Sequence, residues 1–525
     1  MANLENTTDL EGIDPAVYHK RWRILATLCT SLLLVVTGNS SLNLALPTLS
    51  RELSLTSVQL TWMVDIYSLI FASLLFTMSA VADRYGRKMI LQIGLGLFSL
   101  TTLYAAFIAT SGLEIIIARA IMGFSGAMVM PTTLSIINNV FPRKERARAI
   151  AIWSGVAGGG IALGSIITGF LLEHYSWQSV FILSAVIGTI GLIFNQWLTP
   201  SSRDEHETPI DWLGGVLSTI GLFGLVYGII EAPTYGLGHT NIMISLGTGF
   251  ISLGLFIFWQ MRTKHPMLDM RLFKSASFSV SALSITLAFF SLMGVFFSMS
   301  QLFQLIIGYG TLESSIRLLP MMMLMVFISP FVPNIVKRIG TRWTISFGLF
   351  MISVSFFIMS NWPVSPNYSL VIGSMLVMMA GMAWTMTPAT NMLMSSIPRN
   401  RSGMGSAMND TTRELGGTLG VAILGTVLSS TYSHKIAAAV IGLPDQVKTL
   451  AEKSLAGAIV AANNLGPAGD TLVIAAKKAW MHGLSDATIC ACAITITASV
   501  IAAIWLPHKH IEHADDEIVQ PVIEE

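Results

Sequence analysis

The chain has 525 residues, of which 53% are hydrophobic and only 11% are charged, and its formal net charge is +1. Soluble proteins carry about 25% charged residues, so this composition excludes an ordinary water-soluble fold. A net charge so close to zero also excludes the general attraction to nucleic acid that a basic chain has.

The residue inventory offers little for catalysis or metal binding. All three cysteines, Cys29, Cys490 and Cys492, lie within apolar runs. We interpret them as buried apolar side chains rather than as disulfide partners or zinc ligands. The sequence has no P-loop, no H-E-x-x-H helix and no nucleophile elbow. We therefore expect no metal, no cofactor and no enzymatic activity.

About fourteen apolar runs are long enough to cross the ~30 Å hydrocarbon core of a bilayer. Inside lipid each run must satisfy its own backbone hydrogen bonds, so we expect helices. The sequence thus predicts an all-α polytopic membrane protein. The predicted spans are 24–46, 60–82, 89–109, 113–139, 147–172, 177–198, 212–231, 241–261, 277–303, 312–332, 343–361, 368–394, 404–431 and 485–507.

Lysine and arginine residues orient these spans. They concentrate in the N-terminal segment, in the loops after even-numbered spans and in the C-terminal tail, as Arg84 and Lys88 illustrate. Cytoplasmic loops carry the excess of basic residues in membrane proteins. The pattern therefore predicts a multi-pass protein of the cell (inner) membrane with both termini in the cytoplasm.

One long segment, 432–484, is predicted to be an extracellular loop rather than a span, because it contains several lysines. Its pattern indicates two short amphipathic helices broken at Gly466-Pro467-Ala468-Gly469. Either it folds as a helical hairpin over the outer mouth, or it is a solvated loop without function.

Two basic loops resemble each other across the chain. The loop after the second span contains Asp83-Arg84-Tyr85-Gly86-Arg87-Lys88, and the loop after the tenth contains Lys337-Arg338-Ile339-Gly340-Thr341-Arg342. This repeat predicts two six-helix bundles in pseudo-symmetric repeat, plus two inserted transmembrane helices. The predicted divisions are an N-terminal segment (1–23), an N-terminal bundle (24–198), the inserted helices (199–276), a C-terminal bundle (277–507) and a tail (508–525).

Asp83, Arg84, Gly86 and Arg87 resemble the loop signature of the major facilitator superfamily, with Ser79 in place of its first glycine. The resemblance implies that this loop takes part in a conformational switch between the two bundles. The alternative is ordinary anchoring of the loop in the cytoplasm by its basic residues.

Two further spans resemble motifs of the same superfamily. Arg119 heads a fourth-span motif, and a charged residue within a span is a functional candidate. The alternative is that it pairs helices or reaches the membrane surface. Gly160, Gly164 and Gly169 resemble the fifth-span antiporter motif, in which small residues let helices pack closely.

The chain is most similar, within that superfamily, to the fourteen-helix drug:proton antiporters, which include efflux pumps for quaternary ammonium compounds. Segments 62–69 and 414–425 carry this resemblance. It implies a monomeric, proton-coupled multidrug efflux transporter, associated with antibiotic resistance, that exports small amphipathic molecules by alternating access. The alternatives are a proton-coupled exporter or importer of one dedicated metabolite, a membrane-embedded enzyme and a receptor.

Three positions depart from the pattern of cation exporters. Gly38 stands where relatives commonly carry an aspartate, Met325 stands where some carry an acidic residue, and Asn409-Asp410 replaces an acidic pair. The resemblance therefore implies a less anionic pore and a preference for monovalent or neutral amphiphiles over dications.

Proton coupling needs a carboxyl that titrates within the membrane. Burial disfavours its ionised form and a nearby cation favours it. The candidates are Asp65, Asp410 and Glu414, together with Arg119. Asp410 and Glu414 share one helix face at spacing i, i+4, and Arg413 is close enough to pair with one of them. A purely structural salt bridge is the alternative for Glu414, and a solvated position is the alternative for Asp65.

Five residues are candidates for lining the substrate cavity: Trp62, Met325, Trp384, Asn409 and Arg413. Tryptophan faces can stack on a cation, and methionine adapts to varied ligands. Trp62 is equally typical of an interfacial anchor.

Overall fold

The computed structural model describes residues 13–53, 57–202, 210–236, 238–398, 401–462 and 467–507. Within these ranges the chain forms helices and no β-strand. Thirteen helical segments of the described chain are long and apolar enough to cross a membrane, which confirms the all-α polytopic class. The predicted span 147–172 lies in α6 (Arg143–His174), which is not one of the thirteen.

Six helices form the N-terminal group: α2 (Pro15–Glu52), α3 (Ser57–Tyr85), α4 (Arg87–Phe107), α5 (Gly112–Val140), α6 and α7 (Gln178–Leu198). Local chemistry sets their ends. At the start of α5, the Ser111 hydroxyl and the Glu114 carboxylate each accept a hydrogen bond from the other residue's backbone N–H. Arg21 of α2 forms an ion pair with Glu145 of α6 at 2.6 Å.

Two helices, α8 (Trp212–Tyr235) and α9 (Thr240–Gln260), follow as an antiparallel pair. The carboxylate of Asp211 caps α8 and also accepts hydrogen bonds from Trp259 and Gln260 at 2.9 and 2.7 Å. This one side chain therefore joins the start of α8 to the end of α9. The pair lies on α3, where the Thr77 hydroxyl approaches the Gly215 carbonyl oxygen at 3.3 Å.

The C-terminal group begins after the short helix η1 (Met270–Lys274). Its longer helices are α10 (Ala276–Gln301), α11 (Thr311–Ile328), α13 (Thr341–Ser360), α14 (Tyr368–Ser395), α15 (Ser402–Ile436) and α18 (Pro467–Trp505). Short segments connect or extend them, namely η2 (Leu302–Ile307), η3 (Ser329–Phe331), α12 (Val332–Ile339), η5 (Ala437–Val440), α16 (Asp445–Lys453) and α17 (Leu455–Ala462).

The prediction for 432–484 was partly wrong. Instead of a second short helix before a span at 485, α18 runs without a break from Pro467 into the final span. Its first turns already have a buried face, which includes Leu472 and Trp480, so the span simply extends outward. α16 and α17 form a folded hairpin, held in part by the Tyr432 hydroxyl, which donates to the Ala451 carbonyl at 2.7 Å. Gly466 lies outside the described residues.

The two repeated segments have the same backbone conformation at their glycines. Gly86 and Gly340 each directly precede a helix, with φ of 111° and 83° respectively. A residue with a Cβ rarely adopts such values, so glycine is required at both turns. The preceding basic residues are not in loops, as predicted, but in the last turns of α3 and α12. Each chain reversal therefore occurs at a single glycine.

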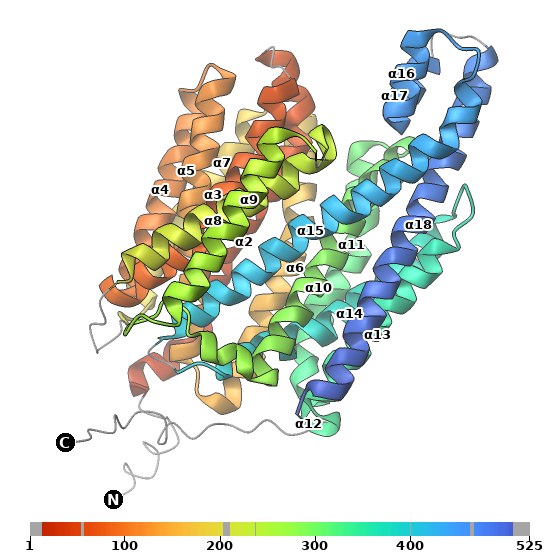
Figure 1. The fold of residues 1–525 in the computed structure, drawn as a ribbon. Coiled ribbons are helices and arrows are strands. Elements are labelled where there is room, and N and C mark those ends of the chain that lie inside the picture. Colours follow the sequence, from red (N-terminus) through yellow and green to blue (C-terminus); the bar gives the residue numbers. More distant parts are fainter. Residues whose placement is uncertain are drawn as a thin grey trace, which may run out of the picture.

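The two groups of helices meet near the end of the bundle where α2 starts and α18 ends, and their ribbons diverge toward the other end (Figure 1). We call the first the basic end, because it carries Arg84, Lys88 and Arg143 in the terminal turns of α3, α4 and α6. Near it, the hydroxyls of Ser135 on α5 and Ser402 on α15 lie 2.7 Å apart. The Ser406 hydroxyl donates to the Pro131 carbonyl at 2.6 Å.

At the opposite end, the hydrogen bonds seen among the described residues lie within one group. The indole N–H of Trp177 donates to Glu52 at 2.8 Å in the N-terminal group. In the C-terminal group, Trp480 donates to Gln301 at 3.2 Å. The structure is therefore closed at the basic end.

Small residues let α10 and α15 pack backbone to backbone. A Cβ added to Gly420 would overlap the carbonyl oxygen of Phe290, and one added to Gly416 would overlap that of Thr286. We expect Gly420→Ala to destabilise the protein by about 1–3 kcal/mol, because the two helices must separate. A lower midpoint of thermal unfolding in detergent would show this.

The matched control is Gly254→Ala in α9, where an added Cβ meets nothing within 4 Å. Alanine favours a helix over glycine by ~1 kcal/mol, so this variant should unfold at the same temperature or higher. Equal midpoints for the two variants would contradict the close packing of α10 on α15.

Candidate functional site

Two consecutive turns of α15 place polar and charged side chains in the interior of the bundle. Asn409, Asp410 and Arg413 are buried, and Glu414 is half-buried. The Asn409 amide donates to the Asp410 carboxylate at 3.1 Å and its oxygen accepts from Thr390 of α14 at 3.0 Å. This network fixes one carboxylate oxygen of Asp410, while the other has no hydrogen-bond partner among the described residues.

Arg413 extends from α15 to aromatic rings on two other helices. Its guanidinium carbon lies 4.5 Å from the ring centroid of Trp153 on α6 and 5.2 Å from that of Phe289 on α10. None of its three side-chain nitrogens has a hydrogen-bond partner within the described chain. The predicted pairing of Arg413 with a carboxylate is therefore not seen as a close contact, although Asp410 acts on it electrostatically.

Glu414 lies where α15 crosses α3. Ser68 of α3 is within hydrogen-bonding reach of the Glu414 carboxylate. The neighbouring Leu415 packs against a small apolar cluster of Leu69 and Ala72 of α3 and Val226 of α8. The two carboxyls that share a face of α15 thus have different surroundings, since Asp410 is enclosed and Glu414 faces the other group of helices.

Asp65 is separated from this segment of α15 and lies at the contact of α3 with the inserted helix α8. It is half-buried, and Glu231 of α8 acts on it electrostatically. Trp62, one turn earlier, lies 6.0 Å from Tyr227 of α8 between ring centroids. The structure therefore places two predicted residues, Asp65 and Trp62, beside the inserted pair.

Arg119 of α5 joins three helices of the N-terminal group. Its guanidinium donates to the carbonyl oxygens of Met63 on α3 at 3.0 Å and of Gly38 on α2 at 2.8 Å. It also lies 4.4 Å from the ring centroid of Tyr67, whose hydroxyl donates to the Val35 carbonyl. A fully buried guanidinium is costly in the membrane interior, and these contacts offset that cost.

Gly38, where the family resemblance led us to expect an aspartate, has little free space beside it. A Cβ at this position would lie 2.7 Å from the ring of Phe98 on α4. The phenyl ring therefore occupies the volume that an acidic side chain would need. Arg119 binds the carbonyl group of Gly38 in place of a carboxylate.

The predicted switch loop lies at the basic end, between the two groups. Asp83 pairs with the buried Arg87 at 2.7 Å. The Asp83 carboxylate also lies against Gly403, in the first turn of α15, so closely that a Cβ there would overlap it. A carboxylate is favourable near a helix N-terminus because the N–H groups there are unpaired.

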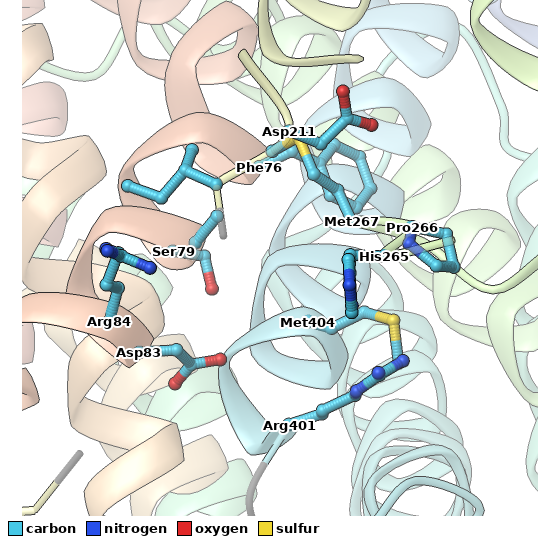
Figure 2. A pocket seen from close by; sticks show the side chains of 12 residues that line it. Phe76, Ser79, Asp83, Arg84, Asp211, His265, Pro266, Met267, Arg401 and Met404 are labelled. Carbon is cyan, nitrogen blue, oxygen red and sulfur yellow. The ribbon is translucent and has the colours of Figure 1, made fainter. Parts of the chain in front are cut away.

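A small pocket lies behind this contact (Figure 2). Arg84 and Asp83 of α3 line one side, and Arg401 and Met404 of α15 line another. The connection after α9 closes it through His265, Pro266 and Met267. The inserted pair therefore touches the same contact that joins the two main groups.

The glycines of α6 lie against two helices. A Cβ on Gly160 would meet Leu33 and Val36 of α2 at 3.0 and 3.3 Å. Gly164 is buried and Gly169 is half-buried. The sequence motif did not include Gly159, where a Cβ would come within 2.5 Å of Val326 on α11. Small residues of α6 thus serve both the N-terminal packing and the contact between the groups.

The remaining cavity candidates lie elsewhere. Met325 of α11 is buried within the main core. Trp384 of α14 packs against Phe347 of α13 at 5.3 Å between centroids, and Phe347 is itself exposed on the outer surface of the bundle. Neither residue contacts the charged segment of α15 through an interaction seen in the structure.

Sequence reasoning missed two residues of this region. Glu231 is an acidic residue within an apolar run. Charge is costly to bury in a membrane, so this position alone could have identified Glu231 as a functional candidate. Trp153 is fully buried and contacts Arg413. The sequence contains no signal for this role, because residue spacing in an apolar helix does not distinguish a tryptophan that faces a ligand from one that packs in the core.

Comparisons with known proteins agree with the fold. The family model of the Major Facilitator Superfamily matches residues 28–421. The multidrug efflux pump LfrA of Mycolicibacterium smegmatis is 32% identical over 486 residues, covering 92% of this chain and 96% of that protein. The methyl viologen resistance protein SmvA of Salmonella typhimurium is 31% identical over 473 residues, covering 89% and 94%.

Among solved structures, the human organic anion transporter MFSD10 superposes with a TM-score of 0.62. The match covers 92% of this chain and 99% of that one, at 12% sequence identity. At this identity the likeness concerns the fold alone.

We expect Arg119→Lys to destabilise the protein, because a lysine ammonium cannot reach the Met63 and Gly38 carbonyls together. Loss of one charge-assisted hydrogen bond from a buried site costs about 1.5–3 kcal/mol. The midpoint of thermal unfolding in detergent measures the effect.

The same replacement at Arg317 is the control. Arg317 pairs with Glu313 on the exposed surface of α11 at 2.7 Å, and exposed pairs contribute about 1 kcal/mol or less. Similar shifts for both variants would refute the role of Arg119 in joining the helices.

Proposed function

Because this chain belongs to the Major Facilitator Superfamily, we propose that it exports amphipathic small molecules, cationic or neutral, in exchange for protons by alternating access. Membership of this superfamily makes it a membrane transporter. LfrA, which matches over nearly its whole length, is a multidrug efflux pump. We propose that this chain likewise transports many different compounds.

The observation that carries the proposal is the buried charged segment of α15. Asp410, Arg413 and Glu414 lie in the interior, where charge is expensive unless it serves a function. A buried carboxyl gains or loses its proton according to the water and the cations that reach it. A rearrangement of α15 changes both, so proton binding and conformation become linked.

We assign roles to the candidate residues on this basis. Asp410 and Glu414 exchange the proton, because one lies within the C-terminal group and the other faces α3. Asp65, with Glu231, forms a second acidic position beside the inserted pair. Arg119 maintains the arrangement of α2, α3 and α5 that presents these groups.

The contact of Asp83 with the start of α15 is the element that holds the basic end closed. Its carboxylate favours the helix N-terminus only while α15 lies against α3. When α15 tilts away, Asp83 retains Arg87 as its partner. Breaking this contact therefore leaves the Asp83 carboxylate paired, which favours a reversible transition.

The proton gradient supplies enough free energy. One charge moved across 100 mV provides ~2.3 kcal/mol, and each pH unit adds ~1.4 kcal/mol. A tenfold concentration ratio requires ~1.4 kcal/mol. One proton per cycle therefore sustains a substrate gradient between about tenfold and a few hundredfold.

The basic residues support the orientation. With the basic end in the cytoplasm, the helix ends that carry Arg84, Lys88 and Arg143 follow the positive-inside rule. Both termini are then cytoplasmic, and the end at which the two groups meet is the cytoplasmic one. We propose that the transporter works as a monomer in the cell membrane, because the charged segment lies within one chain.

Everted membrane vesicles with an acid interior and a lumenal pH dye test the exchange. In the wild type, amphipathic cations should discharge the acid interior as they enter in exchange for protons. We expect Asp410→Asn to abolish this response, because the amide cannot carry a proton, and Asp65→Asn to weaken it.

Asp486→Asn is the matched control, since Asp486 is exposed on α18 and only accepts a hydrogen bond from Thr431 at 2.9 Å. It should transport as the wild type does. If the folded wild type responds to no compound of a broad amphiphile panel, multidrug exchange is wrong and a transporter of one dedicated metabolite takes its place.

A further inference from the structure

The guanidinium of Arg413 lies against two aromatic rings. Among the described residues it has none of the hydrogen-bond partners that a buried arginine normally has. Its carbon lies 4.5 Å from the Trp153 centroid and 5.2 Å from the Phe289 centroid. Arg413 is only 3% exposed, and its three nitrogens make no hydrogen bond within the described chain. Leaving such a group unpaired costs free energy, so the arrangement calls for an explanation.

The two rings form what we call the aromatic cage, Trp153 and Phe289. The Trp153 side chain is fully buried, and its indole N–H donates to the Thr133 hydroxyl at 3.1 Å. That hydrogen bond fixes the ring plane. Phe289 is half-buried and comes from α10, so the cage spans both groups of helices. Ring faces around a cation are how proteins recognise organic cations.

Asp410 lies three residues before Arg413, on the same side of α15, yet no ion pair joins the two within the described chain. One oxygen of Asp410 is without a partner. The other titratable groups here are Glu414, on which Asp410 acts electrostatically, and Tyr67 of α3, which interacts with Glu414 and Arg119. The charged group acting directly on Arg413 is Asp410.

We propose that the aromatic cage is a binding site for an organic monocation, and that Arg413 is a built-in competitor for it. When Asp410 is neutral, the guanidinium lies in the cage, which is the position that it has in the structure. When Asp410 is ionised, it attracts the guanidinium and leaves the cage free for a substrate cation. Proton and substrate then exclude each other, which is the requirement for exchange. This inference rests on the proposed function and names its cationic subsite.

Equilibrium binding of ethidium, a planar fluorescent monocation, tests the inference in purified protein without any proton gradient. In the wild-type background, Asp410→Asn should weaken binding by about tenfold or more, because the guanidinium stays in the cage. Arg413→Gln alone should tighten binding. In the Arg413→Gln background, Asp410→Asn should change the affinity less than twofold, which corresponds to a coupling of ~1 kcal/mol or more.

The double-variant comparison separates competition from simple attraction. If Asp410 merely attracts the ligand, Asp410→Asn costs the same affinity with and without Arg413, and the inference is wrong. Within the Arg413→Gln background, Phe289→Leu should lower the ethidium affinity by roughly tenfold, the size of a desolvated cation–π contact. Phe297→Leu, an exposed position on the same helix, should leave it unchanged.

Elution volume and thermal unfolding establish that each variant is folded. Arg413→Lys provides a second test, because it keeps the charge but lacks the flat guanidinium that stacks against the rings. This variant should bind ethidium more tightly than the wild type when Asp410 is neutral. An unchanged affinity for both Arg413 variants overturns the competitor role. Because no gradient is used, these results are independent of the vesicle assay: a protein that binds as described but exchanges no protons refutes the proposed function and not the cage.

Discussion

Charge is costly inside a bilayer, and the architecture of this transporter depends on how it accommodates a few buried charges. Arg119 donates to carbonyl oxygens of two neighbouring helices. Arg87 pairs with Asp83. Within the described chain, Arg413 contacts aromatic faces, is subject to the field of Asp410 and makes no hydrogen bond through its side chain. The first arrangement joins helices permanently. The last lacks hydrogen bonds, so little opposes its rearrangement, and it lies on the helix that contacts both groups.

That helix, α15, has two kinds of contact: a close backbone contact with α10 and polar contacts with α3 and α5. α15 packs on α10 through Gly416 and Gly420, where an added methyl group has no room. Its first turns contact α3 and α5 through Asp83, Ser135 and Pro131. The first contact is apolar and lies within one group. The second consists of a few polar interactions between groups, which makes it the natural place for separation.

How well the sequence predicted these features depended on the kind of signal. Apolar run length predicted the all-helical class, because lipid allows few alternatives. Gly86 and Gly340 were found through a repeated pattern, and both adopt a backbone conformation that only glycine tolerates well. The start of α18 was missed, because lysines near 477 indicate solvent whereas Lys477 donates to the Ile306 carbonyl at 2.9 Å. Trp153 was missed because its role depends on a partner 260 positions later on another helix.

Contacts at the basic end join the two groups of helices, and alternating access requires that the opposite end close when these contacts separate. Spin labels at Tyr85 and Ile339 report the basic end, and labels at Ser176 and Asn361 report the opposite end, in a background without Cys29, Cys490 and Cys492. Gly403→Val places a side chain against Asp83 and should separate α15 from α3. Alternating access predicts that the first distance lengthens and the second shortens. Unchanged distances, or lengthening at both ends, would contradict the account.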